Sequence, residues 1–462
     1  MIILSIELRL YSSTKIKNYM DQIIIKNCSI INEGKIIEGD VLVKNSRIDK
    51  VGGIIDEANA REINGEGKHL IPGIIDDQVH FREPGLTHKA NIATESRAAL
   101  AGGVTTFMEM PNTKPAALTQ ELLQDKYDIA KQTAFTNYSF FMGASNDNLE
   151  EALKTDRNKI CGVKIFMGSS TGNMLVDDRD VLDKLFGNLD ILIATHCEDE
   201  ETIRANHASY VERFGNDLDA TYHPIIRSRE GCLLSSSLAV ELAKKHNTRL
   251  HILHISTKDE IDLFDNSIPL KDKRITSEAC VHHMFFKDED YHSLGNKIKC
   301  NPAIKAEADR KAIFDAVFDD RIDIIATDHA PHTVEEKSRH YLEAPSGLPL
   351  VQHALNIMLD FYHKGEVNLE EIVRKMCHTP AECFQLSERG YIREGYYADL
   401  ALVDIHKTWE VSKDNILYKC GWSPLEGYQL KGKVEKTLIN GMLAFDGESL
   451  IPGYGMRVLF DR

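Results

Sequence analysis

Short apolar runs rich in β-branched residues recur through the middle of the chain, and each is followed by a stretch in which apolar residues repeat with the period of an α-helix. Eight such runs lie at residues 69–76, 103–110, 138–144, 161–167, 189–196, 249–256, 274–280 and 321–328. The clearest amphipathic stretches between them lie at residues 118–132, 232–246 and 307–320. Eight alternating strand and helix units predict an α/β fold with a TIM-like (β/α)8 barrel, whose functional side chains lie at the carboxyl ends of the strands.

The two ends of the chain differ from the middle, because they contain short β-rich runs separated by glycine and asparagine turns. We expect both ends to build one small β-sandwich domain, from residues 20–71 and 386–462, beside a barrel at residues 72–385. Residues 1–19 are expected to be a disordered or dispensable extension. Their apolar start is interrupted by Glu7 and Arg9 and is followed by no clear small-residue cleavage site, so it is a poor signal peptide.

Composition narrows the class of protein. Of the 462 residues, 42% are apolar and 27% are charged, which allows a large buried core. The formal net charge of -16 argues against a nucleic-acid partner, because phosphate binding needs clustered lysine and arginine. The nine cysteines include no CxxC pair, and no apolar run approaches the roughly 18 residues that span a bilayer. We therefore expect a cytoplasmic protein that binds neither nucleic acid nor membrane.

Polar side chains that can bind metal stand where the apolar runs stop. His80, His196, His254 and Asp328 follow or close four different runs, so a barrel would bring them together. Imidazole and carboxylate are suitable ligands for zinc. Any one of these residues alone would be better explained as a strand cap or a core hydrogen bond, but four in register favour a metal site. Lys164 lies inside a run, where a buried cation is costly, and would either pair with Asp328 or carry CO2 as a carbamate that ligates metal.

Several motifs occur in order between about residues 71 and 378: "PGIIDDQVHFREPGLTHK", "MPNTKP", "VKIFMGSSTG", "THCED", "LHIST", "NPAIK" and "ATDHAPHT". Together they resemble the dihydroorotases of the amidohydrolase superfamily, and "GYYADLALVD" resembles the small domain of that superfamily. The resemblance implies metal-dependent, reversible hydrolysis of the cyclic amide of (S)-dihydroorotate to N-carbamoyl-L-aspartate, a step of pyrimidine (UMP) biosynthesis. It also implies a homodimer acting on a small-molecule substrate.

The resemblance assigns roles residue by residue. It implies one or two Zn²⁺ per chain, with His80 on the more exposed ion, N6-carboxylated Lys164 bridging both ions, and His196 with His254 on the second. Asp328 would bind metal and move the proton, as the catalytic residue. The residues implied in substrate binding are Arg82, Asn112 and His332 for the carboxylate, Asn301 in the "NP" loop, and Gly347 through its backbone. The planar fork of Arg82 suits a carboxylate, which a lysine would not match.

The chain departs from the family at Gln78, where the first histidine of the usual His-x-His pair is expected. An amide oxygen is a weaker zinc ligand than imidazole. We therefore expect one metal position to bind more weakly, or Asp76 or a water to compensate. Ser346 stands where the family more often has a bulky apolar residue, which could alter packing around the substrate ring.

Two other hypotheses remain open on sequence. A dihydropyrimidinase (hydantoinase) or an allantoinase is favoured by the lysine in "KIFMG", whereas Arg82 and His332 favour a substrate with a carboxylate. A non-catalytic, dihydroorotase-like partner protein is favoured only by Gln78, and the presence of Asp328 argues against it. Metal content separates the last hypothesis from the others, and substrate preference separates the first two.

Overall fold

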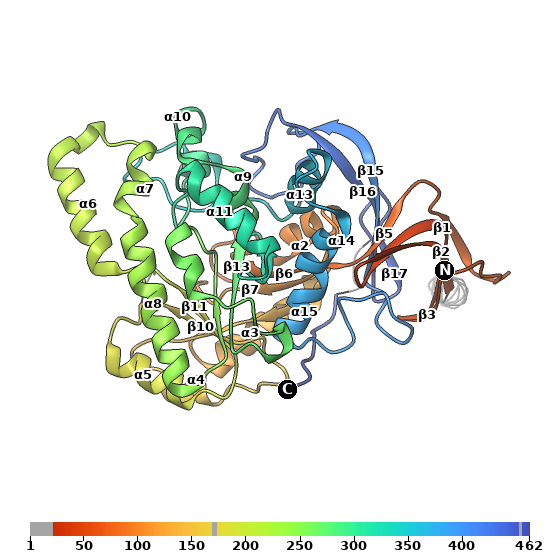
Figure 1. The fold of residues 1–462 in the computed structure, drawn as a ribbon, viewed down its shortest axis with the longest axis horizontal. Helices are drawn as coiled ribbons and strands as arrows, with labels where there is room; N and C mark the ends of the chain where they lie inside the picture. Colours follow the sequence, from red (N-terminus) through yellow and green to blue (C-terminus); the bar gives the residue numbers. More distant parts are fainter. Residues whose placement is uncertain (1–21, 169–172, 452–454) are drawn as a thin grey trace, which may run out of the picture.

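The computed structural model describes residues 22–168, 173–451 and 455–462. It consists of a barrel surrounded by helices and a sheet beside it, which combines red strands from the N-terminal end with blue strands from the C-terminal end (Figure 1). The extension predicted at residues 1–19 lies outside the described residues.

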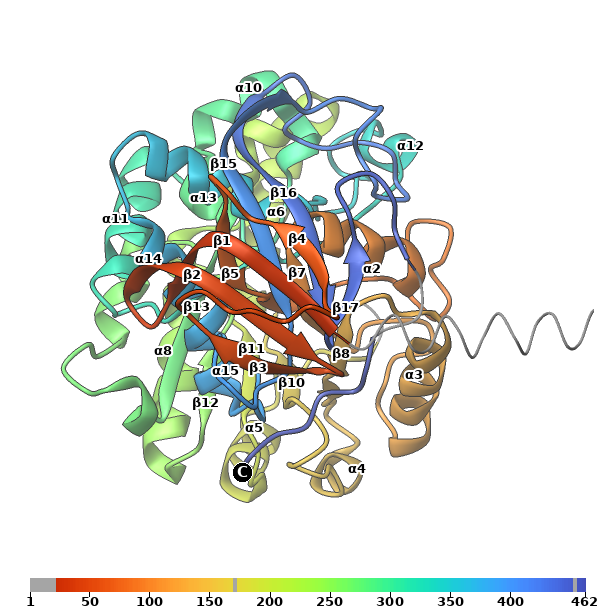
Figure 2. The ribbon, with the colours of Figure 1, turned by 90° about the vertical axis from the view of Figure 1, so that its right-hand side faces the viewer.

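One mixed sheet joins the two ends of the chain, as predicted for the small β-domain. Its strands pair in the order β17-β16-β15-β5-β1-β2-β3, and β4 pairs with β1. Figure 2 shows these strands crossing in front of the barrel. Their bounds are β1 Gln22–Asn32, β2 Lys35–Lys44, β3 Arg47–Val51, β4 Arg61–Asn64, β5 His69–Pro72, β15 Leu400–Glu410, β16 Gln429–Ile439 and β17 Met442–Phe445.

All eight central runs form parallel strands of the barrel, which confirms the predicted (β/α)8 architecture. The strands are β6 Ile74–Val79, β7 Val104–Glu109, β8 Asn137–Phe140 continued by β9 Met142–Gly143, β10 Val163–Phe166, β11 Ile193–His196, β12 Leu250–Ile252, β13 Ile275–Cys280 and β14 Ile324–Ala326. The barrel closes between the last and first strands through a parallel bridge of Val79 with His329. The His80 N–H also donates to the His329 carbonyl at 2.7 Å.

The first run is divided between two sheets, which its continuous apolar character did not indicate. Residues before Gly73 belong to β5 of the terminal sheet, and those after it belong to β6 of the barrel. A Cβ at Gly73 would lie 2.0 Å from Thr105 Oγ1 on the next strand. The crossing from sheet to barrel therefore requires a residue without a side chain.

Helices connect the barrel strands and cover their outer face. They are α2 Ile92–Ala101, α3 Gln120–Thr133, α4 Leu149–Leu153, α5 Arg179–Asn188, α6 Glu200–Phe214, α7 His223–Ile226, α8 Arg229–His246, α9 Val281–Phe285, α10 Tyr291–Leu294, α11 Glu307–Phe318, α12 Val334–Lys337, α13 Ala354–His363, α14 Leu369–Val373 and α15 Thr379–Phe384. The three predicted amphipathic stretches correspond to α3, α8 and α11. Within the described residues, we find no helix with the length and apolar character needed to cross a membrane.

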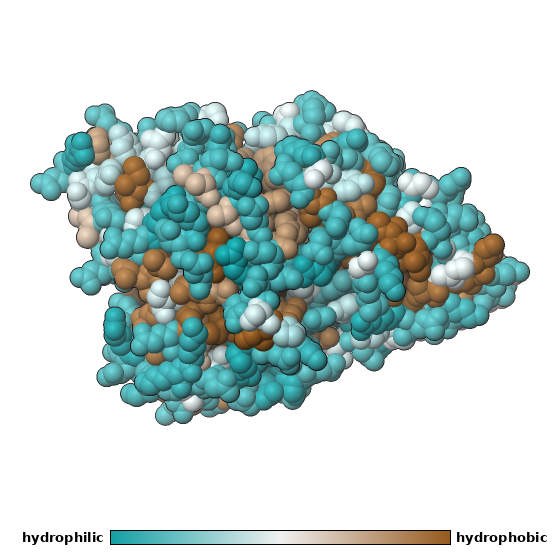
Figure 3. All heavy atoms as spheres, viewed as in Figure 1, coloured by the Kyte–Doolittle hydropathy of each residue, from teal (hydrophilic) through white to brown (hydrophobic). Residues whose placement is uncertain are grey.

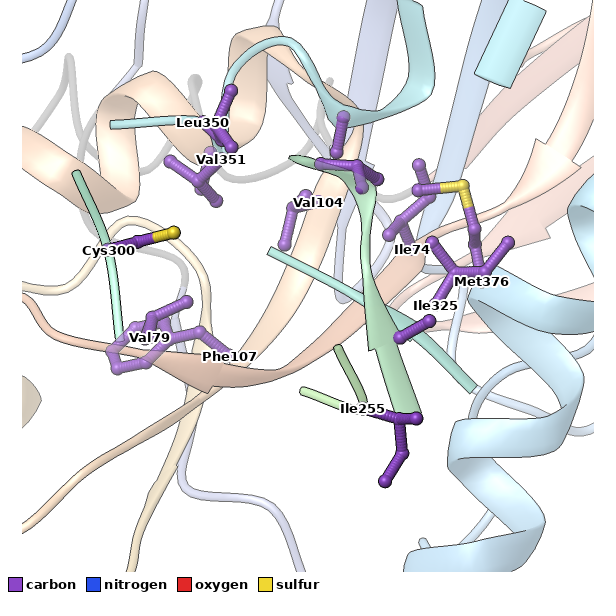
Figure 4. Close-up of a cluster of buried hydrophobic side chains, with 14 of the residues drawn as sticks. Ile74, Val79, Val104, Phe107, Ile255, Cys300, Ile325, Leu350, Val351 and Met376 are labelled. Atoms are coloured by element: carbon purple, nitrogen blue, oxygen red, sulfur yellow. The ribbon is translucent and has the colours of Figure 1, made fainter. Parts of the chain in front are cut away.

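The barrel strands carry the largest core. Val79 on β6, Phe107 on β7 and Ile325 on β14 are fully or almost fully buried, and Figure 4 shows them among other buried side chains. The face of the molecule in Figure 3 is covered mainly by hydrophilic residues, with apolar patches between them. All nine cysteines are free thiols.

Two parts of the C-terminal region return to the barrel. The Tyr138 N–H on β8 donates to the Met456 carbonyl at 3.0 Å, and the Val458 N–H donates back to Tyr138 at 3.1 Å. The connection between β15 and β16 reaches the barrel near the carboxyl ends of its strands, where the Trp422 indole N–H donates to the His332 carbonyl at 2.7 Å. The terminal residues therefore support the barrel as well as the terminal sheet.

A buried ion pair at the barrel gives a prediction about stability. Lys126 Nζ on α3 lies 3.0 Å from Glu109 Oε2 at the end of β7 and donates to the Met110 carbonyl, and both side chains are buried. Lys126→Met leaves the carboxyl group buried without its cation, which is expected to lower the free energy of unfolding by about 3 kcal/mol. Denaturant titration measures this, with Lys311→Met in the exposed Lys311–Asp315 pair as the control. Equal stability of the two variants would contradict the expectation.

Candidate active site

A cavity of about 380 Å³ opens at the carboxyl ends of the barrel strands. All ten residues predicted for the site line it: His80, Arg82, Asn112, Lys164, His196, His254, Asn301, Asp328, His332 and Gly347. The strand ends therefore bring these residues into one volume, as the barrel hypothesis required. Arg82, His254 and Asp328 have left-handed backbone conformations, with φ of 70°, 42° and 45°. Such conformations in residues other than glycine are concentrated at functional sites.

His196 and His254 form one pair of candidate ligands. His196 Nδ1 lies 2.9 Å from His254 Nε2, and on the opposite side of its ring His196 Nε2 donates to Glu198 Oε2 at 2.9 Å. Because Nε2 carries the proton, His196 Nδ1 presents a lone pair towards His254. Burial lowers the pKa of both imidazoles, which favours the neutral form that binds metal. A histidine oriented by a carboxylate behind it is a common arrangement at metal sites.

His80 and Asp328 form the second pair. His80 Nδ1 donates to Asn112 Oδ1 at 2.8 Å, so its Nε2 presents a lone pair to Asp328 Oδ1, which lies 3.2 Å away. Burial lowers the pKa of His80, which disfavours a proton between the two atoms. Two acceptors that face each other in a buried site are stabilised by a cation, so this pair fits a metal ion.

Lys164 lies buried on β10, which pairs with β11, the strand that carries His196. Among the described residues its Nζ has no hydrogen-bond partner, and it lies 4.5 Å from the centre of the Phe166 ring. Burial lowers the pKa of this amine to about 7. The alternative of an ion pair between Lys164 and Asp328 was therefore wrong, since the amine is left without a partner. An unpaired buried amine fits a site where its charge is removed by modification or metal binding.

The candidate ligands form two separate pairs rather than one cluster. Among the described residues, the groups of three whose ligand atoms lie within 4.8 Å of one another are Cys280 with His282 and His283, and Asp77 with His251 and Glu278. Both groups are buried, and their residues do not line the cavity. The donor set in the cavity therefore suits two neighbouring ions with a group between them, or one ion at either pair.

Gln78 lines the cavity at the position of the missing histidine. Its Oε1 lies 3.6 Å from the thiol of Cys280 on β13. Asp76 does not compensate for it: both Asp76 oxygens accept hydrogen bonds from Thr327, and the carboxyl group is buried outside the cavity lining. The suggestion that Asp76 supplies a replacement ligand was therefore wrong.

One part of the cavity lining is basic. Arg82 Nε donates to the Pro331 carbonyl at 3.1 Å, and Arg82 Nη2 lies 3.0 Å from His332 Nε2. Asn301 Oδ1 is buried and has no hydrogen-bond partner in the part of the chain that the structure describes. Gly347 has φ of 134°, and a Cβ there would lie 2.5 Å from the Ala330 carbonyl oxygen. Cationic donors beside a buried amide oxygen suit a polar ligand with an anionic group.

Sequence reasoning missed two residues that contact this site. Glu198 orients His196, and its only sequence signal is its position two residues further along in "THCED". Lys89 lines the cavity with Nζ 2.9 Å from His332 Nδ1, and its only sequence signal is its place as the last residue of "PGIIDDQVHFREPGLTHK".

Comparison with known proteins gives consistent results. The amidohydrolase family profile matches residues 69–444. The chain is 32% identical to a dihydroorotase of Halobacterium salinarum over 91% of this chain and 97% of the relative. It is 30% identical to a dihydroorotase of Bacillus cereus over 93% and 99%. Among solved structures, an L-hydantoinase (dihydropyrimidinase) from Arthrobacter aurescens matches with a TM-score of 0.90 at 25% identity, covering 95% of this chain and 100% of that structure.

Proposed function

The chain belongs to the amidohydrolase family, and on that premise we propose that it is a dihydroorotase, which hydrolyses the cyclic amide of (S)-dihydroorotate reversibly to N-carbamoyl-L-aspartate. The observation that carries the proposal is that Arg82 and His332, whose nitrogens lie 3.0 Å apart, line the same cavity as the metal-capable pairs. A cyclic amide with a carboxylate needs both groups of residues. The relatives named dihydroorotase match this chain over 97% and 99% of their own length, and they support the same substrate.

The arrangement of the cavity residues suggests which of them would bind metal and which would transfer the proton. His80 with Asp328 would hold one ion, His196 with His254 the other, and Lys164 as a carbamate would bridge them. A divalent ion supplies an electrophile for the amide carbonyl and lowers the pKa of water from about 15.7 towards 7. Asp328 would accept the proton of the attacking water and return it to the amide nitrogen that leaves. Its Oδ1 faces His80, so Oδ2 is the oxygen left for proton transfer.

The substrate carboxylate would bind at the basic part of the cavity lining. Arg82 offers its terminal N–H groups, since Nε is already occupied by Pro331. Asn112 uses Oδ1 to orient His80, which leaves its amide N–H₂ to donate to the substrate. Asn112 would thus connect the two parts of the site. Asn301 and the Gly347 backbone complete the proposed contacts to the ring.

Further parts of the proposal are zinc as the ion, carboxylation of Lys164, a role in pyrimidine biosynthesis, a homodimeric assembly and a cytoplasmic location. Carboxylation is supported by the buried, unpaired amine, whose pKa of about 7 leaves a large neutral fraction to react with CO2. The proposed division into an extension at 1–19, a small domain at 20–71 and 386–462, and a barrel at 72–385 also remains part of this proposal.

A hydantoinase is the second candidate, because an L-hydantoinase is the structural neighbour with a TM-score of 0.90. That likeness covers 95% of this chain and reports the fold rather than the substrate. A hydantoin has no carboxylate for Arg82 and His332 to bind, so the buried cation would be left without a partner. The basic part of the cavity lining therefore favours dihydroorotate.

Complementation tests the proposed function in a cell. The gene should restore growth without added pyrimidine to a strain that lacks its dihydroorotase, and Asp328→Asn should not restore it at the same protein level. Failure of the wild-type chain to complement, with folded protein present, would contradict the proposal.

Gln78 gives a prediction about metal binding. Purified protein supplied with zinc and bicarbonate should keep one tightly held ion per chain after dialysis against a weak chelator, because an amide is a poorer ligand than imidazole. Gln78→His should raise the number of tightly held ions towards two per chain. Elemental analysis measures the metal content of the wild-type protein and of the variant. Two ions of nearly equal affinity in the wild-type protein would contradict this account of Gln78.

A further inference from the structure

Lys89 lies at the basic part of the cavity lining without an assigned role. It stands on the loop between β6 and α2, and its side chain is 13% exposed. Its Nζ lies 2.9 Å from His332 Nδ1 and 3.0 Å from Glu336 Oε1 on α12. Lys89 is therefore held between a carboxylate and the imidazole that the proposed function places on the substrate carboxylate.

These contacts determine which nitrogen of His332 carries the proton. A lysine ammonium only donates hydrogen bonds, so His332 Nδ1 must accept and Nε2 must carry the hydrogen. That arrangement also satisfies the Ser346 carbonyl, which lies 2.9 Å from Nε2. The other tautomer would direct an N–H at the Lys89 ammonium and would leave Ser346 without its donor. Burial and the charge of Arg82 lower the pKa of His332, so the ring is neutral and one tautomer must be chosen.

The chosen tautomer places two donors side by side. His332 Nε2–H and Arg82 Nη2 lie 3.0 Å apart, and neither can accept from the other. Because the Nε2–H is donated to Ser346, His332 does not accept from Arg82, and the Arg82 N–H that faces the ring is left to donate to an anion such as a carboxylate. With the opposite tautomer, His332 Nε2 would accept from Arg82 and would occupy the guanidinium internally.

We propose that Lys89 is a positioning residue that holds His332 in the Nε2–H tautomer, so that His332 does not accept from Arg82 and the guanidinium stays free to bind the carboxylate of the ligand and select it over neutral cyclic amides. This inference rests on the proposed function for the identity of the ligand. Its physical basis, an arginine N–H kept free by the tautomer that a lysine sets, is independent of turnover.

The other neighbours of His332 hold the residue in place but do not determine which ring nitrogen carries the proton. Trp422 donates to the His332 carbonyl, which holds the backbone. Glu336 Oε2 lies 3.6 Å from His332 Nδ1, too far for a normal hydrogen bond. The Lys89 ammonium is thus the donor within hydrogen-bond distance of Nδ1. Lys114 also lines the cavity, is exposed, and provides a matched control because its removal changes the charge equally.

Calorimetry on the full-length, metal-loaded protein tests the inference with orotate, a planar cyclic carboxylate, and with uracil, which lacks the carboxylate. Lys89→Met should weaken orotate binding about 10- to 100-fold, as expected for a lost charge-assisted contact. Uracil binding should stay the same. Lys89→Arg should restore most of the affinity, and Lys114→Met should change it less than about 3-fold, as for a screened surface charge.

Kinetics with dihydroorotate provide a second readout. Lys89→Met should raise KM in parallel with the loss of orotate affinity and should change kcat much less, because the contacts of Lys89 are with His332 and Glu336 rather than with the metal-capable pairs. Unchanged orotate binding in Lys89→Met, an equal loss in Lys114→Met, or no preference of the wild-type protein for orotate over uracil would overturn the inference. If orotate binding depends on Lys89 but dihydroorotate is not hydrolysed, the proposed function fails and the inference stands.

Discussion

Arg82→Met is expected to lower kcat/KM for dihydroorotate by about 1000-fold, equivalent to roughly 4 kcal/mol of lost transition-state binding. The guanidinium is buried, and its terminal N–H groups are the strongest donors in the basic part of the cavity lining. Methionine fills similar space but leaves a substrate carboxylate without its partner. Steady-state kinetics at saturating zinc and bicarbonate measure the effect.

Arg82→Lys is the matched control, because it keeps the charge and removes the planar fork. It should recover only part of the activity, since an ammonium does not reproduce two parallel hydrogen bonds. Any residual activity on a neutral hydantoin should be unaffected by Arg82→Met. A loss of less than about tenfold on dihydroorotate in folded Arg82→Met would show that the carboxylate binds elsewhere.

Asp328→Asn is expected to lower kcat by about 10³- to 10⁴-fold, the upper range for loss of a positioned proton-transfer group. Asparagine keeps the shape and one oxygen towards His80 Nε2, at 3.2 Å in the native protein. It cannot accept the proton of the attacking water. Stopped assays of N-carbamoyl-aspartate formation detect rates this low.

Metal content decides how the loss in Asp328→Asn is interpreted, since the same residue is a proposed ligand. The ion held by His196 and His254 should remain, because their contacts do not involve Asp328. Asp315→Asn on the exposed face of α11 serves as the control for handling and folding. A variant with retained metal and a kcat within tenfold of the wild type would remove Asp328 from the proposed proton transfer.

The sequence predicted the barrel because each strand combines an apolar run with a polar residue at its end. That register placed His80, His196, His254 and Asp328 correctly in one cavity, although they are far apart in the chain. It also predicted that the first barrel strand begins before Gly73, whereas β6 begins at Ile74. The reason is that the residues on both sides of the sheet-to-barrel junction are equally apolar. Periodicity reports burial and does not report which sheet provides it.

Contacts between distant residues without a distinctive neighbourhood were not predictable. Lys89 and His332 are separated by 243 positions, and Gln78 and Cys280 by 202. No local pattern links the members of either pair. Likewise, whether Lys164 forms an ion pair with Asp328 depends on the distance between the two side chains, which spacing along the chain does not determine.

The central claim is that the cavity recognises a cyclic amide by its carboxylate. The most direct measurement is the ratio of kcat/KM for dihydroorotate to that for a hydantoin and for allantoin, with the same protein purified with zinc and bicarbonate. The arrangement of Arg82 and His332 predicts a preference for dihydroorotate of at least about 10³-fold, since a buried donor left unpaired penalises the neutral rings. Comparable turnover of a hydantoin, or no turnover of all three by folded and metal-loaded protein, would contradict the claim.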